Sequence, residues 1–262
     1  MSAVHSRQVG HGPLPLVFIP GLFGQGKNWT SIAKALGDEA TSLLIDAPNH
    51  GRSAWTDAFD YDEAAELIAS EIARHPMFQD GYVLVGHSMG GKLAMRLALA
   101  HPGAVRLLVI VDISPITGHV GSQFGGLVAA MRGLDLSHLA SRHQADDALR
   151  DEIPDDAVRA FLLQNLHRDH GTWSWRMNLP LLGDSLDLIG EWPPTSASYD
   201  GPVLWIAGDR SPYIKPDHVP VMRRYFPKAV LVRIKDAGHW VHSEQPERFV
   251  DALRTFLALN PH

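Results

Sequence analysis

Short runs of apolar and β-branched residues recur along the chain and predict buried strands. Each run is apolar at successive positions, which is typical of strands covered by helices on both faces. The runs occupy residues 15–19, 42–45, 82–85, 107–111, 203–206 and 230–234. Between them, hydrophobic residues repeat with helical spacing at 62–74, 89–100 and 246–257. This alternation predicts an α/β fold with a mostly parallel central sheet flanked by helices.

The alternation stops between residues 114 and 199. Helical patterns such as 155–166 follow one another there without a convincing strand. The stretch EWPPTSASYDGP ends this part of the chain, and its Pro and Ser residues are typical of a hinge or linker. We therefore expect a core formed by residues 1–113 and 200–262, with a helical cap at 114–199 inserted after the strand that ends at Asp112.

Composition and charge exclude several classes of protein. The chain has 23 Lys and Arg against 29 Asp and Glu, a formal net charge of −6, and no segment gathers the basic residues that nucleic acid requires. Without cysteine, disulfides, thiolate nucleophiles and cysteine-bound metals are excluded. The first residues lack the apolar stretch of a signal peptide, and run 107–111 is too short to span a bilayer. We expect a cytoplasmic protein that binds neither nucleic acid nor membrane.

The candidate nucleophile is Ser88, in the sequence GHSMG at 86–90. This G-x-S-x-G pattern follows a predicted buried strand and precedes a predicted helix, which is the strand-turn-helix context that gives the motif its meaning. Glycines two residues to either side leave room for a tight turn that presents the hydroxyl above the sheet. The alternative is a glycine-rich turn with a capping serine.

Two backbone amides are candidates for an oxyanion hole. In a nucleophile turn of this kind, one amide belongs to the residue after the serine, here Met89, and the second to a loop that follows an early strand. The glycine-rich sequence FIPGLFG at 18–24 provides that loop, and we expect Leu22 to donate, with Phe23 as its neighbour. A simple strand-to-helix turn is the alternative.

His239 is the candidate base among 15 histidines. It follows the last predicted strand and precedes the last predicted helix, where a loop at the carboxyl end of the sheet can reach Ser88. His242 is a nearby competitor, and His87 adjoins the nucleophile in sequence. A histidine can accept the serine proton and return it to the leaving group at neutral pH.

Together these motifs resemble the α/β-hydrolase superfamily over nearly the whole chain. Within it the chain is similar to small esterases related to bacterial YbfF and to animal abhydrolase-domain-11 proteins. The resemblance rests on PGLFG, DAPNHGRS, GHSMGGK, VDISP, WRMNL and AGHWVH. One departure is Pro20, where relatives usually carry the histidine of an HG pair.

The resemblance also bears on the catalytic acid. Most of the superfamily carries it in a G-x-x-D pattern after the strand that follows the cap, but here Gly208 leads to Ser211, and Asp209 falls two residues early. The resembled esterases carry their acid at the end of the preceding strand, which implies Asp112. Asp209 remains the competitor, and an aspartate at a strand end can also cap a turn. Ser211 is expected to hydrogen-bond Asp112, the alternative being an ordinary loop serine.

The substrate side of the site is predicted from sequence neighbours and from the cap motif. A mostly apolar pocket suits short or medium acyl chains. Aromatic residues in the cap could equally fasten the cap to the core. The candidate pocket residues are Phe23, Trp175, Arg176, Asn178, Tyr213 and Trp240.

No cofactor and no metal are expected. His167 and His170 are three residues apart, but without a matching carboxylate or a third histidine nearby they are a weak indication of a metal site, and a solvated helix end is the better interpretation. The predicted function is hydrolysis of a small carboxylic ester or thioester through an acyl-Ser88 intermediate. Carbon–carbon bond hydrolysis, lyase, acyltransferase or haloperoxidase chemistry on the same fold remains open, as does a slow-turnover small-molecule receptor. The sequence does not indicate an oligomeric state.

Overall fold

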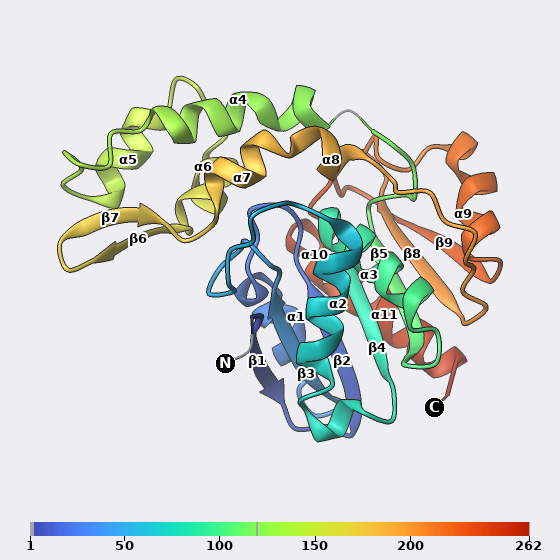
Figure 1. Cartoon of the computed structure of the whole chain (residues 1–262). Coiled ribbons are helices and arrows are strands. Elements are labelled where there is room, and N and C mark those ends of the chain that lie inside the picture. The colour runs from blue at the N-terminus through green and yellow to red at the C-terminus, as the bar shows by residue number, and fades with distance from the viewer. Residues whose placement is uncertain (1–2, 119, 262) are drawn as a thin grey trace.

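The computed structural model describes residues 3–118 and 120–261 and contains a seven-stranded sheet in the order β1-β3-β2-β4-β5-β8-β9 (Figure 1). All neighbouring strands are parallel except β1, which pairs antiparallel with β3. The strands are β1 (His5–Gly10), β2 (Leu14–Ile19), β3 (Ala40–Asp46), β4 (Tyr82–His87), β5 (Val105–Val111), β8 (Val203–Gly208) and β9 (Ala229–Ile234). The predicted α/β fold with a mostly parallel sheet is confirmed.

Strand β1 was missed because its sequence, HSRQVG, is largely polar. It lies at the edge of the sheet and its residues are only half-buried or exposed. A continuous apolar run indicates a strand that is covered on both faces, and the sequence of an edge strand of this kind contains no such run.

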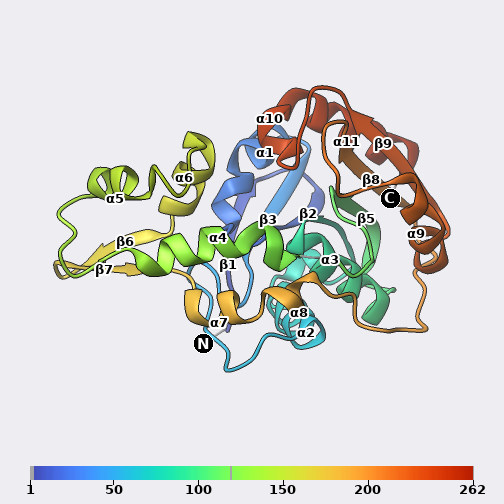
Figure 2. The same cartoon turned by 90° about the horizontal axis from the view of Figure 1, so that it is seen from above.

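Helices cover both faces of the sheet, as Figures 1 and 2 show. Alternate residues of the central strands face opposite layers: Val17 and Ile19 of β2 pack in one buried cluster, and Leu16 and Phe18 in the other. The first cluster includes helices α2, α3 and α9, and the second includes α1 and α11. The helices are α1 (Thr30–Ala35), α2 (Tyr61–Ile72), α3 (Met89–Ala100), α9 (Val219–Tyr225), α10 (Val241–Glu244) and α11 (Pro246–Leu259), with short 3-10 turns at η1 (Gly26–Trp29), η2 (Pro76–Phe78) and η3 (Pro216–His218).

Residues 114–199, which we call the inserted segment, leave the sheet after β5 and return to it at β8. In Figure 1 this segment lies across the upper end of the core, and its β6–β7 hairpin extends beyond the β1 edge. Its elements are α4 (Val120–Gly133), α5 (Arg142–Leu149), α6 (Asp156–Leu163), β6 (Leu166–Asp169), β7 (Thr172–Trp175), α7 (Leu179–Asp184) and α8 (Leu186–Gly190).

The β6–β7 hairpin corrects the expectation that this segment is helical throughout. The two strands pair antiparallel around the turn residues His170 and Gly171, whose φ angles are 44° and 90°. Two successive positive φ angles are the backbone requirement of a type I′ two-residue hairpin turn. The interpretation of His167 and His170 as a helix end is therefore wrong. The strands are four residues each, too short to show a pattern that separates strand from helix.

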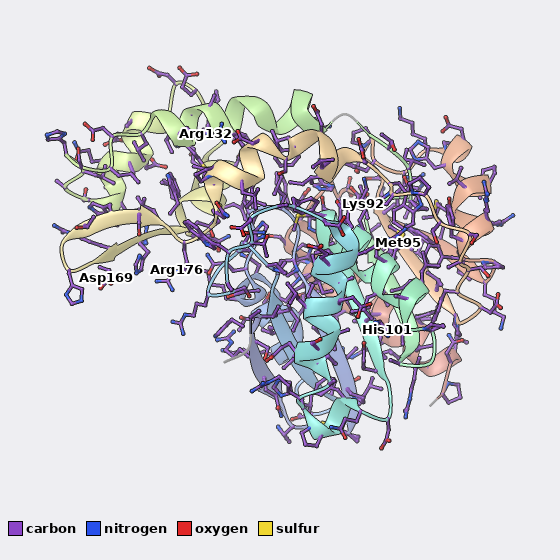
Figure 3. The ribbon with its side chains drawn as sticks, in the orientation of Figure 1. Lys92, Met95, His101, Arg132, Asp169 and Arg176 are labelled. Carbon is purple, nitrogen blue, oxygen red and sulfur yellow. The ribbon has the colours of Figure 1, made fainter. Side chains whose placement is uncertain are left out.

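Buried polar contacts attach the inserted segment to the core. Lys92, on the first turn of α3 (Figure 3), donates to the carbonyl oxygens of Gly190 and Glu191 at 2.7 and 2.8 Å, at the end of α8. Burial lowers the pKa of Lys92 to about 8. At the other end of the segment, Asn165 donates to the Phe23 carbonyl at 2.8 Å and accepts from Gln25 at 2.6 Å. The first contact is made from α3, which begins directly after Ser88, and the second is made to the loop that carries Leu22 and Phe23.

Among the described residues, no helix is both long enough and apolar enough to span a bilayer.

Candidate active site

Ser88 occupies a strained turn between β4 and α3. Its φ and ψ angles are 54° and −123°, a region that costs a non-glycine residue of order 1–3 kcal/mol. The flanking glycines are required by contact: a Cβ on Gly86 would lie 2.2 Å from the Gly90 carbonyl oxygen, and one on Gly90 would lie 2.2 Å from the Pro20 carbonyl oxygen. The turn can therefore form only with glycine at both positions, and it leaves Ser88 8% exposed.

The loop after β2 packs directly on this turn. A Cβ on Gly21 would lie 3.1 Å from the Ser88 Cβ atom, so the two backbones are nearly in contact. Leu22 lines the same small cavity as Ser88. In the described part of the chain, no acceptor is found for the backbone amide of Leu22 or of Met89. Both amides are thus available to an oxygen atom that enters this cavity. The departure at Pro20 leaves the loop in place, with its carbonyl against Gly90.

Asp112 and His239 form a hydrogen-bonded pair at the carboxyl ends of the strands. Asp112 Oδ2 lies 2.8 Å from His239 Nδ1, and Asp112 is fully buried. The carboxylate also accepts the Gly208 amide at 3.1 Å and the Ser211 hydroxyl. A buried carboxylate requires such donors, because an unpaired charge in the interior is very unfavourable. Because Asp112 engages Nδ1, the other ring nitrogen of His239, Nε2, is not used by this pair and is available to a group in the cavity that His239 lines.

Asp209 does not join this group. Its backbone amide donates to the Ile234 carbonyl at 3.1 Å, and the residue is exposed. Ser211 lies in the loop after β8, and its hydroxyl donates a hydrogen bond to the Asp112 carboxylate. The geometry therefore groups Asp112, Ser211 and His239 and leaves Asp209 outside.

Ser88 and His239 line one cavity, but no hydrogen bond between their side chains is found among the described residues. Contacts between nucleophile and base are often long in the absence of substrate. The Tyr213 ring stacks on the His239 ring with 4.1 Å between centroids and 19° between planes. This stacking and the bond to Asp112 fix the plane of the imidazole.

The competing histidines, His87 and His242, are buried beside His239. His87 Nε2 lies 2.9 Å from the His239 carbonyl oxygen, so its N–H donates to that backbone. The His242 ring stacks on Trp29 at 4.0 Å. Burial, and secondarily the charge of His239, lowers the pKa of His87 well below its usual value and that of His242 to about 3. Both rings are neutral at physiological pH and support the loop that holds His239.

The cavity that holds Ser88 is small, about 20 Å³, and it is largely apolar. Phe124 and Phe161 of the inserted segment line it, together with Trp240 of the core. A wider cavity of about 340 Å³ shares Asn28, Phe161, Trp240 and His242 with it and continues toward Val158. The two cavities therefore meet at the Phe161 and Trp240 rings, whose centroids are 6.0 Å apart.

Of the six predicted pocket residues, only Trp240 lines the cavity with Ser88. Phe23 is fully buried with its ring 6.1 Å from Phe124, and Tyr213 lies behind His239. The other three lie away from this cavity. Asn178 caps α7 and bonds the Asn49 side chain at 3.1 Å, which fastens the inserted segment to the core. Trp175 is the last residue of β7. Arg176 follows it at the base of the hairpin (Figure 3) and faces a different cleft.

Phe124 and Phe161 were missed as pocket residues. Each belongs to a helix of the inserted segment, and the sequence of an amphipathic helix does not reveal whether its apolar face meets the core or a ligand. Only their helical spacing was visible. In the described residues, no group of three or more His, Asp or Glu side chains is arranged to hold a metal ion. His167 instead contacts Ser174 across the hairpin.

The comparisons with known proteins agree with this geometry. The α/β hydrolase fold family matches residues 15–246. The chain belongs to this family. It is 40% identical over 256 residues to the sn-1-specific diacylglycerol lipase ABHD11 of Mus musculus, covering 95% of this chain and 83% of that protein. It is 31% identical to the esterase YbfF of Escherichia coli K12, over 94% of each chain. These relatives confirm the resemblance to the esterase branch of the α/β hydrolases.

A solved structure described as a marine microorganism esterase superposes on this α/β hydrolase with a TM-score of 0.92 and 33% identity, covering 97% of this chain and 99% of that one. The likeness extends through the inserted segment, because nearly all of both chains is covered. The hydrolase thus shares its complete architecture with that protein.

The stability of the hydrolase should depend on pH through His242. Between about pH 4 and pH 6, the unfolded chain carries a proton on this histidine that the folded chain lacks, since the folded pKa is about 3 and the usual value about 6.5. The free energy of unfolding therefore falls as the pH falls, by about 1.4 kcal/mol per pH unit from this group. His242→Phe keeps an aromatic ring on Trp29, cannot bind a proton, and should reduce the slope by that amount. Urea unfolding at several pH values measures it, and equal slopes in parent and variant would contradict the assignment.

Proposed function

We propose that this hydrolase cleaves carboxylic esters or thioesters through an acyl-Ser88 intermediate. The observation that carries the proposal is the pairing of buried Asp112 with His239 beside the cavity that holds Ser88. A nucleophile on a strained turn, a histidine and a buried carboxylate are the groups that acyl transfer requires. The names of the similar proteins, a lipase and two esterases, support the same reaction.

Each residue has a role in the proposed reaction. His239 accepts the Ser88 proton while Oγ forms a bond to the carbonyl carbon, and Asp112 stabilises the imidazolium. The carbonyl oxygen becomes an oxyanion, which accepts hydrogen bonds from the Leu22 and Met89 amides. Collapse breaks the bond to the leaving alcohol or thiol, which takes the proton from His239. Water, activated by His239, then releases the acid and restores Ser88.

The cavities suggest which substrates fit. The narrow space at Ser88 accepts the reacting carbonyl, and the 340 Å³ cavity beyond Phe161 and Trp240 accommodates a short or medium acyl chain or leaving group. Apolar contact drives binding of such groups. We propose that the inserted segment, residues 114–199, acts as a cap over the core formed by 1–113 and 200–262, since it supplies Phe124 and Phe161 to the wall of the Ser88 cavity.

Turnover of p-nitrophenyl esters tests the function. The parent should hydrolyse esters of short to medium chain length, and Ser88→Ala should lose at least about 10⁴-fold in kcat, because the acyl intermediate cannot form. A chain-length series measures kcat/KM for both proteins. Absence of Ser88-dependent hydrolysis across the series would reject the esterase proposal in favour of a receptor or another chemistry on this fold.

The identity of the acid is tested by a matched pair of substitutions. Asp112→Asn should lower kcat by roughly 10⁴-fold, the size of effect seen when the corresponding serine-protease aspartate is replaced by Asn. Asp209→Asn is the control, since Asp209 is exposed and outside the hydrogen-bonded group, and it should leave kcat within about twofold. The opposite ranking of the two variants would show that Asp209 is the acid.

Ser211 is proposed to hold the Asp112 carboxylate in place. Ser211→Ala removes a hydrogen bond to a charged group and should lower kcat by roughly tenfold or more. Ser211→Thr retains the hydroxyl and should restore most of the rate, which a loss of packing alone would not predict. Unchanged kcat in Ser211→Ala would leave the serine as an ordinary loop residue.

A further inference from the structure

A second cleft, of about 560 Å³, lies between the β6–β7 hairpin and the β1 edge of the core. It is separate from the cavity at Ser88, with which it shares no lining residue. The core contributes residues of β1, β3 and η1, and the inserted segment contributes residues of α5, β6 and the end of β7. Six of the lining side chains are cationic: Arg7, Lys27, Arg52, Arg142, Arg168 and Arg176.

The six cations are not neutralised by ion pairs among the described residues. None of them forms an ion pair of 4.0 Å or less with an acidic side chain in the part of the chain that the structure describes. Asp46 is the one carboxylate on the cleft wall among the described residues, and it is already engaged. Its oxygens accept the Gly26 amide at 2.7 Å and the Arg52 amide at 2.9 Å, and they lie 3.1 Å from His5 Nδ1.

Elsewhere in the inserted segment, arginines are neutralised. Arg132 pairs with Asp184 at 2.8 Å, Arg150 with Asp147 at 2.8 Å, and Arg159 with Asp146 at 2.9 Å. The chain as a whole is acidic, with a net charge of −6. Within the described part of the inserted segment, the arginines without an ion pair are thus the three that line the cleft, and a concave surface of one sign attracts ions of the other.

The positive charges of the cleft lie close enough to one another to interact unfavourably. Burial, followed by the charges of Arg176 and Arg142, lowers the pKa of Lys27. Several groups are also free to bind: the Arg52 and Arg176 guanidinium groups make no hydrogen bond among the described residues. Planar guanidinium groups match the paired oxygens of phosphate, and a lysine adds a point charge.

We propose that this cleft is a binding site for a small, multiply charged phosphate anion that bridges the inserted segment and the core. Three cations of each part face the same space: Arg7, Lys27 and Arg52 come from the core, and Arg142, Arg168 and Arg176 from the inserted segment. The walls are predominantly polar, with Gln25 and Gln164 adding amide groups, so an apolar ligand gains little there. The site goes beyond the proposed hydrolysis and does not require it.

Isothermal titration of the intact protein with inorganic pyrophosphate tests the site. The parent should bind, and its melting temperature should rise with pyrophosphate concentration, since a ligand that binds the folded state stabilises it. Arg52→Gln/Arg176→Gln removes two positive charges without removing a side-chain hydrogen bond, so the double variant should fold. Its dissociation constant should rise by at least about tenfold, because hydrogen bonds to charged groups are lost.

The matched control is Arg223→Gln/Lys228→Gln, which removes two exposed cations outside the cleft. It changes the net charge equally and should bind pyrophosphate as the parent does. Equal weakening in both double variants, or no binding by the parent, would overturn the proposal. Glycerol 3-phosphate distinguishes the source of the phosphate: tighter binding than pyrophosphate supports the phosphate of a larger organic molecule, and weaker binding supports a free polyphosphate. Both measurements are independent of ester hydrolysis.

Discussion

The buried carboxylate of Asp112 is the constraint on which the rest of the site depends. Since the group is inaccessible to water, every oxygen lone pair that carries its charge must find a donor inside the protein. Three different parts of the chain provide these donors: the end of β8 through Gly208, the following loop through Ser211, and the loop after β9 through His239. A single charge thereby brings the end of one strand and two loops together above the sheet.

The same constraint explains why a serine stands at position 211, where most of the superfamily is expected to carry an acid. An aspartate at position 211 would bring a second negative charge to the Asp112 carboxylate, which is strongly unfavourable at hydrogen-bond distance in a buried site. A hydroxyl at that position donates instead. Asp112 after β5 and Ser211 after β8 are therefore two parts of one hydrogen-bonded arrangement.

Much of this could be predicted from the sequence, because buried strands and glycine-limited turns have local signals. The apolar run at β4 and the glycines around Ser88 are enough to indicate both the strand and the tight turn that follows it. The edge strand β1 and the β6–β7 hairpin are polar or short, so they lack such a signal. The cavity wall was hidden for another reason: Phe161 reaches Ser88 only through the tertiary placement of α6, which no local pattern contains.

The ammonium of Lys92 has a mechanical consequence for the inserted segment. Lys92 lies one turn after Ser88 on α3 and donates to the backbone carbonyl oxygens at the end of α8. The hydroxyl of Tyr61, on α2, donates to the Ile189 carbonyl oxygen at 2.7 Å. The Asn165 and Asn178 contacts hold the same segment to the core at points away from α8. Displacing the segment as a rigid unit, about α8 or any other axis, must therefore break hydrogen bonds at one or more of these attachments.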